Sequence, residues 1–399
     1  MNADEPDWLP TGNETVPWRQ RQRGGTREDR TLTEISASVP PMIARRDYVV
    51  PLDLLRASED ALVAIAGMDA SAADSPAEMT RFMVRTESVA SSKIERVTAS
   101  SEDFARALVG SRGNDSATSM VAGSAAIGMM IDAAGVRGVV ELEDVIAAHR
   151  VLMIDDRDEG PHAGTIRDEQ NWIGGSDYSP RGAWHIPPVP ARVPELMRDL
   201  VEFSNRDDIP VLAQVTIAHA QFETIHPFGD GNGRIGRALV GAILRRRGVM
   251  RNTIVPVASA LNARRGEYFD ALTEYRRGRV TPLLSLMARS MRASGEQGRV
   301  SIERMKAMPS DWHDRAAVRA DSTADRILGA LFQTPVMTMA QLSAAAGTSH
   351  PQVYAAMDKL EDLEIVTEIT GRKRDRVWAA TDIMAELDDL DARIAAAMR

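Results

Sequence analysis

The sequence predicts a mostly α-helical protein with a short β-hairpin in its central part and a winged helix-turn-helix near its C-terminus. Over most of the chain, apolar side chains recur every three or four residues, which is the spacing of one helix face. Ala, Leu and Met are abundant while aromatic residues make up only 5%, and such side chains lose little rotamer freedom in a helix. Apolar and polar residues alternate instead at 181–189 and 365–378, which is typical of strands.

Composition bounds the class of protein. With 399 residues the chain is too long for one compact core, which predicts two or three domains. Its 48 basic and 57 acidic residues give a net charge of −9, which argues against a protein that coats nucleic acid. There is no cysteine, so disulfides, thiol catalysis and cysteine-ligated metals are excluded. The N-terminus lacks the pattern of a signal peptide, and no apolar run approaches the roughly 18 residues needed to span a bilayer. We therefore expect a cytoplasmic protein without a membrane partner.

The first part of the chain is predicted to be an arm followed by helices. Residues 1–40 are rich in Pro, Arg and Gly and show little periodicity, which predicts an extended N-terminal arm. In 41–135, apolar stripes that begin near Pro51 and cover 76–98 predict a helical region, interrupted by a loop at 111–119.

Residues 136–292 form the predicted central core. Gly, Pro and β-prone residues between 155 and 189 predict a loop and the short hairpin. Helical spacing on either side predicts helices at about 141–153, 190–205, 211–225, 233–248 and 264–278.

The C-terminal part changes character twice. Residues 293–322 are charged and weakly apolar, which predicts a linker or a bridging helix. In 323–399, three helical segments and two alternating segments around a turn predict the winged helix-turn-helix, followed by one amphipathic helix.

One short stretch, residues 226–237, reads H-P-F-G-D-G-N-G-R-I-G-R. The spacing before it predicts a helix that Pro227 ends, and helical spacing resumes after the glycines. The stretch is therefore a glycine-rich turn that opens onto the N-terminus of a second helix. Backbone N–H groups freed by the glycines, together with the positive end of that helix, form a site suited to phosphates.

The polar side chains of this stretch suit the same ligand. Arg234 and Arg237 are three residues apart on one helix face, so both can reach one polyphosphate. Asp230 offers a hard oxygen ligand for Mg²⁺, the ion that usually accompanies triphosphates. His226, at the end of the preceding helix, can take a proton from an attacking hydroxyl near neutral pH.

Residues of these types also have ordinary structural roles. A single histidine beside an apolar helix is usually structural, and we expect that role for His149, His219 and His313. For His226, imidazole, carboxylate, glycines and two arginines converge within twelve residues, which favours a functional role. The glycines at 231, 233 and 236 also fit a dinucleotide-binding fingerprint, but that fingerprint follows a strand, whereas the preceding segment here is predicted to be helical. The sequence has no H-E-x-x-H zinc pattern.

Residues 226–237 resemble the signature of the Fic family, H-x-F-x-[D/E]-G-N-G-R-x-x-R, at every fixed position. The resemblance implies a Fic-type helical core that transfers AMP from ATP, with Mg²⁺, to a Ser, Thr or Tyr hydroxyl of a target protein or of itself. It implies that His226 is the general base, that Phe228 packs the loop into the core and that Asp230 holds Mg²⁺. It further implies an anion hole and a phosphate clamp, formed by Gly231, Asn232, Gly233, Arg234 and Arg237.

Two segments before the signature also resemble the family. The segment 181–189 resembles the flap that holds the target segment by strand pairing. Its candidate contacts are Trp184, Ile186 and Pro187. Gly164 and Arg167 resemble the pattern ahead of the flap, although a structural role is at least equally open for them.

Ser91 and Glu95 form a candidate inhibitory motif. On a helix they share a face as an i,i+4 pair, and exposed pairs of this kind are usually plain surface. In the Fic family, however, a Ser/Thr-x-x-x-Glu-Gly/Asn motif lies on an inhibitory helix. The resemblance implies that Glu95 pairs with Arg237 and blocks productive binding of the ATP γ-phosphate, although Arg96 takes the place of the usual Gly or Asn. We expect Glu95→Gly to raise transferase activity.

The winged helix leaves DNA open as a partner without favouring it. Residues 321–380 carry six basic and eight acidic side chains, a net charge of −2, and only the predicted wing G-R-K-R-D-R at 371–376 suits phosphates. We therefore favour a protein-contact or dimerisation role, and a homodimer is compatible with the residue pattern without being required by it. Two alternatives stay open for the chain: removal of AMP from a modified protein by the same site, and a DNA-binding transcriptional regulator that senses nucleotide through its Fic domain.

Overall fold

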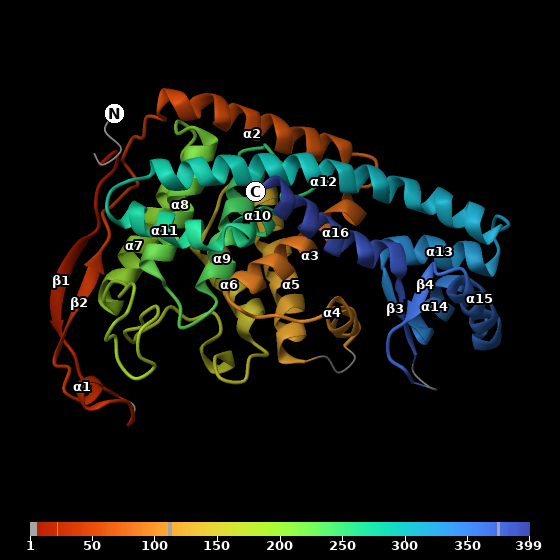
Figure 1. Ribbon diagram of the computed structural model, residues 1–399, viewed down its shortest axis with the longest axis horizontal. Helices are drawn as coiled ribbons and strands as arrows, with labels where there is room; N and C mark the ends of the chain where they lie inside the picture. The colour runs from red at the N-terminus through yellow and green to blue at the C-terminus, as the bar shows by residue number, and fades with distance from the viewer. Residues whose placement is uncertain (1–5, 22, 111–113, 373–375) are drawn as a thin grey trace. The chain divides into compact units, whose positions relative to one another are not determined.

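The computed structural model describes residues 6–21, 23–110, 114–372 and 376–399. Most of these residues lie in helices, so the predicted mostly helical fold class is confirmed. Three predicted features fall partly outside the described residues: 1–5 and 22 of the arm, 111–113 of the loop and 373–375 of the wing. In chain order the elements (Figure 1) are β1 (Gly12–Pro17), α1 (Arg27–Arg30), β2 (Glu34–Val39), α2 (Leu52–Ser71), α3 (Pro76–Ile94), α4 (Ser101–Leu108), α5 (Asp115–Arg137), α6 (Leu142–Met153), η1 (Gly160–His162), η2 (Pro190–Arg192), α7 (Val193–Ser204), α8 (Val211–Ile225), α9 (Asn232–Arg246), α10 (Val257–Ala263), α11 (Arg265–Arg276), α12 (Thr281–Ala316), α13 (Thr323–Gln333), β3 (Val336–Thr338), α14 (Met339–Ala346), α15 (His350–Asp362), β4 (Val366–Glu368), β5 (Val377–Ala380) and α16 (Thr381–Ala397).

The chain folds into two compact units, each made of separated stretches. Unit 1 comprises Met1–Asp60, Ala125–Val249 and Arg264–Arg289. Unit 2 comprises Ala61–Ser124, Met250–Ala263 and Ser290–Arg399. Neither unit is continuous in sequence, so the linear domain boundaries of the sequence analysis stay a prediction.

Helix α8 is the centre of unit 1. All of its residues except the first are buried, and it packs against α7, α9 and α11. Gly236 lets α9 approach closely, because a Cβ at this position would lie 2.9 Å from Phe222 Cδ1 and 2.7 Å from Glu223 Oε1. Close packing therefore explains why the last residue of this type in the signature is glycine. Even a methyl group there would overpack the α8–α9 contact.

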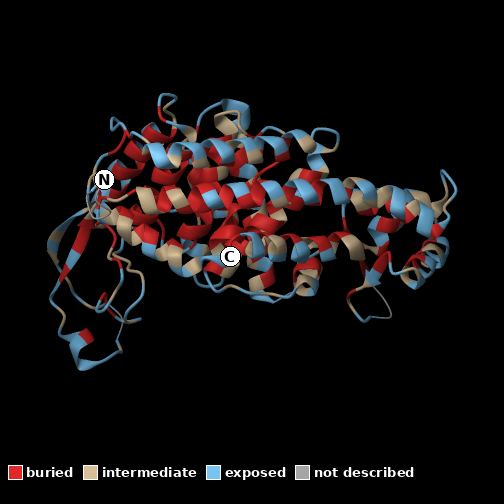
Figure 2. Ribbon diagram, turned by 45° about the horizontal axis from the view of Figure 1, so that its top comes forward, coloured by how far each residue is buried: buried red, intermediate tan, exposed pale blue. Residues whose placement is uncertain are grey.

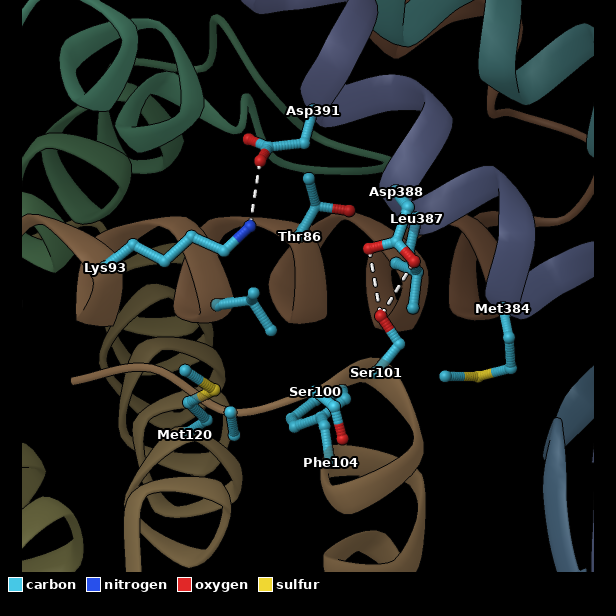
Figure 3. Close-up of a pocket in the computed structure, with 12 residues that line it drawn as sticks. Thr86, Lys93, Ser100, Ser101, Phe104, Met120, Met384, Leu387, Asp388 and Asp391 are labelled. Atoms are coloured by element: carbon cyan, nitrogen blue, oxygen red, sulfur yellow. Dashed lines mark hydrogen bonds and ion pairs between the residues drawn. The ribbon is translucent and has the colours of Figure 1, made fainter. Parts of the chain in front are cut away.

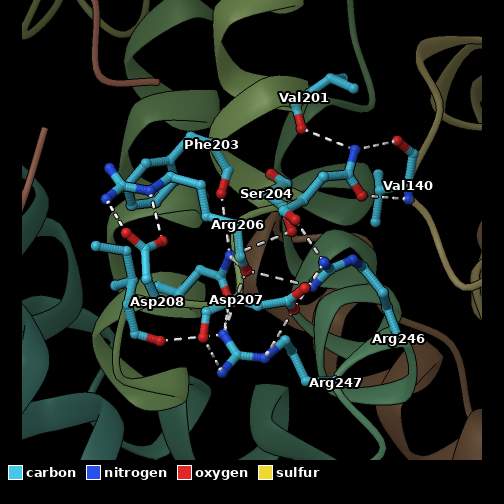
Figure 4. Close-up of polar contacts among 12 residues, drawn as sticks. Val140, Val201, Phe203, Ser204, Arg206, Asp207, Asp208, Arg246 and Arg247 are labelled. Atoms are coloured by element: carbon cyan, nitrogen blue, oxygen red, sulfur yellow. Dashed lines mark hydrogen bonds and ion pairs between the residues drawn. The ribbon is translucent and has the colours of Figure 1, made fainter. Parts of the chain in front are cut away.

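Arginines fasten the C-terminal end of α9 to the turn between α7 and α8 (Figure 4). Arg246 donates to Asp207 Oδ1 at 2.8 Å, while Arg247 donates to Gln214 Oε1 at 2.6 Å and to the Ile209 carbonyl at 3.0 Å. Bonds of this charge-assisted kind are stronger and better oriented than neutral ones. They fix the helix whose opposite end carries the signature.

The N-terminal arm is a β-hairpin, which corrects the prediction of an extended segment. β1 and β2 pair antiparallel along their whole lengths, and α1 lies in the connection, where Thr26 and Asp29 form a capping box. Figure 2 shows this connection, at lower left, as mostly exposed. The signal for β2 is present in E-I-S-A-S-V at 34–39, whose apolar residues alternate, but the Arg- and Gly-rich connection obscures it.

Unit 2 is organised around α3, which packs on α10 and α16. Two buried carboxylates hold neighbouring backbone in place. Glu87 Oε2 accepts a bond from the Ala258 N–H at 2.8 Å, near the start of α10. Asp69 Oδ1 accepts bonds from the N–H groups of residues 251–253 at 2.9, 2.8 and 2.9 Å. Helices α4 and α10 were not predicted, because eight and seven residues are too few for apolar periodicity to stand out.

The last helix, α16, lies against α3 and the start of α4 (Figure 3). Lys93 Nζ pairs with Asp391 at 3.0 Å, and the Ser101 hydroxyl donates to Asp388 at 2.7 Å. Apolar side chains from these helices, including Met384, line a small hollow of about 40 Å³ between them. The C-terminal helix is thus fastened to the helix that carries Ser91.

Residues 323–380 contain the predicted three helices and a hairpin (Figure 1). α13 and α14 flank β3, and the three-stranded antiparallel sheet has the order β3-β5-β4. α14 ends on Gly347, whose φ of 62° lies in the left-handed region, and α15 follows after a short turn. That these elements form a winged helix-turn-helix stays a prediction. Whether it binds DNA stays a prediction.

Two long helices bear on other predictions. Residues 293–316 of the predicted linker or bridging helix belong to α12, which is continuous from Thr281 to Ala316. Among the described residues, α5 alone is long and apolar enough by length and composition to cross a membrane, with 39% of its apolar window buried. By length and composition, α5 therefore contradicts the expectation that no apolar run is long enough to span a bilayer. The core helix of a soluble protein also meets these two criteria.

Candidate functional site

His226 lies at the turn that ends α8. Its backbone has φ 50° and ψ 63°, the left-handed conformation that non-glycine residues rarely adopt. Its N–H still donates to the Phe222 carbonyl at 2.8 Å, so the helix closes onto it before Pro227 prevents continuation. Left-handed residues of this kind persist where surrounding structure fixes them, and they cluster at functional sites.

Arg167 supplies much of that fixation. Its Nε donates to the His226 carbonyl at 2.8 Å, and its Nη2 donates to the Pro188 carbonyl at 2.6 Å and the Ile225 carbonyl at 3.3 Å. Its own N–H donates to the Pro227 carbonyl at 2.9 Å. Burial lowers the pKa of Arg167 to about 10, so the guanidinium remains charged at neutral pH. The side chain ties the His226 turn to the segment before α7, a positioning role.

His149 and Phe228 hold the middle of the loop. Their rings stack with centroids 3.8 Å apart and planes 3° from parallel. The Gly164 N–H donates to His149 Nδ1 at 2.9 Å, so the proton of the neutral ring is on Nε2, which donates to the Asp230 carbonyl at 3.0 Å. Phe228 is fully buried, as the family resemblance implies. Gly164 and His149 therefore act by positioning the loop.

Two asparagine side chains close the loop around Phe228. Asn232 Oδ1 accepts from the Phe228 N–H and Asn232 Nδ2 donates to the Phe228 carbonyl, both at 2.9 Å. Asn171 Nδ2 donates to the same carbonyl at 2.9 Å. The buried side chain of Asn232 therefore holds the loop and does not face the phosphates. Of the predicted phosphate contacts of Asn232, only the one through its backbone N–H is left.

The first turns of α9 carry the glycine N-cap and both arginines of the signature. Gly231 is the N-cap with φ 75°, and it has no side chain to accept bonds from the first helical turn. Arg234 and Arg237 both follow in the first two turns and are buried, with 2% of Arg237 exposed. Oriented N–H groups, the helix dipole and two arginines thus meet at one helix end.

The His226 ring is neutral at physiological pH. Burial, followed by the positive charges of Arg167 and Arg276, lowers its pKa to about 3. The residue as a whole is only partly buried, but its Nδ1 is buried and has no hydrogen-bond partner among the described residues. A neutral imidazole is able to accept a proton, and negative charge from bound phosphates would raise its pKa toward the range of an effective base.

The Asp230 carboxylate is exposed, so a metal ion could reach it. Its side chain is 64% exposed and its Oδ2 lies 3.8 Å from Arg234 Nη2. Burial and the charge of Asp230 raise the pKa of Glu159, which places that carboxyl close by. No group of three or more His, Asp and Glu side chains that could hold a metal exists within the described ranges. This arrangement fits Mg²⁺, which usually binds through one or two carboxylates plus substrate phosphates.

The segment 181–189 differs from the flap that the sequence predicts. It forms no strand: a single antiparallel bridge joins Ile173 to His185, and Trp184 is 77% exposed. The carbonyl groups of residues 186, 187 and 188 already accept bonds, from Ser38 N–H, Gln170 Nε2 and Arg167 Nη2. Strand pairing with a target through Ile186 and Pro187 is thus restricted, because these carbonyls are engaged within unit 1 and proline offers no N–H.

The candidate inhibitory motif lies at the C-terminal end of α3 in unit 2. Ser91 is buried on α3, and Glu95 is the exposed C-cap. The Arg96 N–H donates to the Lys93 carbonyl and the Val97 N–H donates to the Ser92 carbonyl, both at 3.0 Å. These bonds define a Schellman motif, in which the residue after the cap is left-handed and usually Gly or Asn.

Arg96 has φ 62°. The preference for Gly or Asn in the family's motif therefore has a backbone reason: the position requires the left-handed conformation. Arginine fills it here at some cost, without preventing the cap. Glu95 and Arg237 belong to different units, and their pairing stays a prediction.

Comparison with known proteins bears on the domain that carries this site. Residues 139–244 match the Fic/DOC family. The chain carries a Fic/DOC domain. That domain includes α6 to most of α9, and with them His149, Arg167 and the signature loop.

Named relatives align with part of the chain. A probable protein adenylyltransferase from Aquifex aeolicus is 39% identical over 106 residues, 26% of this chain and 31% of the relative. A protein adenylyltransferase from Caenorhabditis elegans is 28% identical over 158 residues, 39% of this chain and 28% of the relative. The aligned segment thus spans less than a third of the length of either relative.

A solved structure shares the fold over a larger part of the chain. A Fic family protein from Desulfovibrio desulfuricans superposes with a TM-score of 0.53 at 22% identity, covering 84% of this chain and 98% of that one. At this identity the likeness concerns the fold, and it confirms the predicted Fic-type helical core.

Several residues that shape the site were not assigned from the sequence. Three of them lie outside the signature: Asn171, Glu159 and Arg276. For His149, the sequence predicts only a general structural role. No local spacing links them to the loop, because their contacts arise from tertiary packing. The G-T-I-R pattern at 164–167 is the one signal that pointed to this neighbourhood.

Proposed function

We propose that this chain transfers AMP from Mg²⁺-bound ATP to a hydroxyl of a target protein or of itself, with His226 as the general base. The observation that carries the proposal is the signature loop: a neutral imidazole beside a helix N-terminus that holds two buried arginines. The adenylyltransferase names of the relatives that match part of this chain support the same activity.

The loop suggests how the phosphates are held. The backbone N–H groups of residues 232 and 233 and the guanidinium groups of Arg234 and Arg237 bind them, with the positive end of α9 behind. The Gly231 N–H donates to Asp230 Oδ1 at 2.6 Å. Mg²⁺ bound by Asp230 and phosphate oxygens would neutralise charge as it develops on the leaving group. Contacts of this kind stabilise a transition state mainly through positioning and electrostatics.

His226 carries the proton transfer. The target oxygen forms a bond to the α-phosphorus while the bond from that phosphorus to the oxygen bridging to the β-phosphate breaks, and pyrophosphate leaves. The hydroxyl proton passes to the neutral imidazole. The left-handed backbone of His226, held by Arg167, directs the ring at the end of α8.

The proposal includes inhibition by Glu95. The Ser91–Glu95 spacing resembles the family's inhibitory motif, and the Schellman end of α3 presents Glu95 at an exposed position. A carboxylate paired with Arg237 would remove one phosphate clamp and put negative charge where the γ-phosphate belongs. This account predicts more transfer by Glu95→Gly than by the parent. The matched control is Glu364→Gly, which also removes an exposed glutamate at a helix end in unit 2.

Labelled ATP tests the chemistry directly. The purified chain and a cell lysate are incubated with Mg²⁺ and ATP labelled at either the α- or the γ-phosphate. We expect protein-bound label from α-labelled ATP only. His226→Ala is expected to lose transfer by at least about a hundredfold while binding ATP normally, whereas exposed His162→Ala keeps activity. Label from the γ-phosphate, or full activity of His226→Ala, would refute the proposal, and release of AMP from a modified protein would indicate the reverse reaction.

A further inference from the structure

Unit 1 contains a cleft that the chemistry described so far does not use. It encloses about 820 Å³. The signature loop contributes Gly229 to its wall, and the segment after β1 contributes Trp18, Arg19 and Arg21. Arg167 also lines it, the residue that donates to the His226 carbonyl. The cleft therefore connects the immediate surroundings of His226 with the N-terminal hairpin.

A second hollow continues from the first along the hairpin. It encloses about 570 Å³, shares Trp18, Arg19 and Arg21 with the cleft, and adds Arg23 and Arg30. Four arginines and no acidic residue line it. Arg21 pairs with Glu169, but no ion pair of Arg19 or Arg23 is found in the part of the chain that the structure describes. This is a locally basic surface on a chain whose net charge is −9.

The hairpin is a fixed wall of this cleft. In its connection, the Ser179 hydroxyl donates to the buried carboxylate of Asp29 at 2.6 Å. Where the connection follows β1, the rings of Trp18 and Trp172 meet edge to face with centroids 5.5 Å apart. These contacts join the hairpin to the loop that forms the opposite wall, so the arginines are held near the cleft.

We propose that this cleft is the acceptor subsite of the chain, and that it binds an extended segment of the target protein with acidic side chains a few residues from the hydroxyl. The inference rests on the proposed function. Carbonyl groups at 186–188 are already engaged, so the target needs another surface for alignment, and the hairpin offers one. Arg19 and Arg23 suit carboxylates, because the guanidinium fork matches their geometry and charge complementarity selects partners.

The same lining disfavours nucleic acid. Glu159, Asp168 and Asp177 line the cleft between the signature loop and the hairpin. A polyanion would meet these carboxylates along its length. A peptide avoids them if its acidic residues are confined to the part that reaches Arg19 and Arg23. The two halves of the cleft thus specify a neutral stretch around the hydroxyl and an acidic stretch beyond it.

Charge reversal on both partners tests the inference. The full chain carrying Glu95→Gly is assayed with a threonine peptide flanked by glutamates and with its lysine counterpart. We expect the glutamate peptide to have a KM lower by about tenfold, with similar kcat. Arg19→Glu/Arg23→Glu is expected to reverse the preference. Arg27→Glu, which alters an exposed arginine of the same hairpin outside both hollows, should leave it unchanged.

A binding measurement separates this inference from the chemistry. Fluorescently labelled peptides are titrated onto the full chain carrying His226→Ala, and the same charge dependence is expected in Kd. Acidic peptide that binds as expected but is not labelled by the active chain would leave the subsite standing and sink the proposed function. Equal affinity for both peptides, no effect of Arg19→Glu/Arg23→Glu, or tighter binding of a single-stranded oligonucleotide would overturn the inference.

Discussion

Two helix ends in this protein use the same unusual backbone conformation in different ways. His226 follows α8 in unit 1 with φ 50°, and Arg96 follows α3 in unit 2 with φ 62°. A non-glycine residue in the left-handed region costs roughly 1–2 kcal/mol. At His226, Arg167 and the surrounding loop hold the conformation. At Arg96, the bonds that hold it are those of the helix end's own backbone.

The two positions differ in whether the function of the side chain depends on the left-handed backbone. That of His226 depends on it, and that of Arg96 does not. The backbone of His226 sets the direction of an imidazole at the site, and buried side chains far along the chain are committed to it. Arg96 is exposed, and the family's motif has Gly or Asn at its position. We therefore expect the signature loop to be sensitive to changes in its supports, and the end of α3 to tolerate or gain from relief of strain.

The largest effect is expected for Arg167→Ala. The substitution removes charge-assisted bonds to the carbonyls of His226, Pro188 and Ile225 in a buried setting. We expect the free energy of unfolding of the unit to fall by about 3 kcal/mol. Transfer is expected to fall by about a hundredfold, because small misplacements of a catalytic group are costly. Denaturant unfolding and label transfer measure the two effects.

The control is Arg198→Ala, which alters an exposed arginine on α7. Its unfolding free energy is expected to stay within about 0.5 kcal/mol of the parent. If Arg167→Ala behaves like this control, the left-handed turn at His226 is stable without its clamp, and the comparison between the two helix ends loses its basis.

Acidification is expected to affect the two units differently. Burial lowers the pKa of His149 and His219 to about 4, and that of His226 to about 3. The unfolded chain takes up these protons near pH 6.5. Between about pH 6.5 and 4 the unfolded state therefore binds more protons than the folded state, so the stability of unit 1 falls as the pH falls. For each histidine, the free energy of unfolding falls by at most about 1.4 kcal/mol per pH unit.

His313 in unit 2 has the opposite shift. A bond to the Pro309 carbonyl and the carboxylate of Asp325 raise its pKa. Its contribution to stability is fully present below the unfolded pKa and is lost as the pH rises through the folded value. Hydrogen exchange at pH 7.5 and pH 5, corrected for intrinsic rates, should show protection lost first in α8 and α9. Earlier loss in α13 and α14 would contradict this assignment.

The smallest effect is expected for Arg96→Gly. Relief of the left-handed strain favours glycine, while the greater freedom of glycine in the unfolded chain offsets about 0.5–1 kcal/mol of the gain. We expect a net increase in the free energy of unfolding of less than about 1 kcal/mol. Glu364→Gly, at φ 57° after α15, should behave similarly. A clear loss of stability in Arg96→Gly would show that the arginine side chain itself holds the end of α3.

Local sequence patterns were sufficient for the longer helices and the signature loop. The helix, glycine-rich turn and second helix of the signature follow from the apolar spacing of α8 and α9, from Pro227 and from the glycines. These signals act within a few residues of the chain. The position of His226 at the turn follows from the same pattern. Its left-handed backbone does not, because that depends on Arg167, which lies 59 residues earlier in the chain.

Tertiary contacts explain what the sequence analysis missed or misassigned. Asn232 belongs to the signature, but only the structure shows both ends of its amide bonded to Phe228. The hairpin at 12–39 was missed because its connection is rich in Arg and Gly. The 181–189 segment was predicted to be free for strand pairing, but packing against Ser38, Gln170 and Arg167 uses its carbonyl groups.

The most direct test compares AMP transfer from α-labelled ATP by the parent, Glu95→Gly and Glu95→Gly/His226→Ala, all with Mg²⁺ and with nucleotide binding measured alongside. The account predicts weak labelling by the parent and stronger labelling by Glu95→Gly. It predicts none by the double variant, although that variant still binds ATP. Undiminished labelling by the double variant would contradict the role of His226, and no labelling by any of the three would contradict the proposed transfer itself.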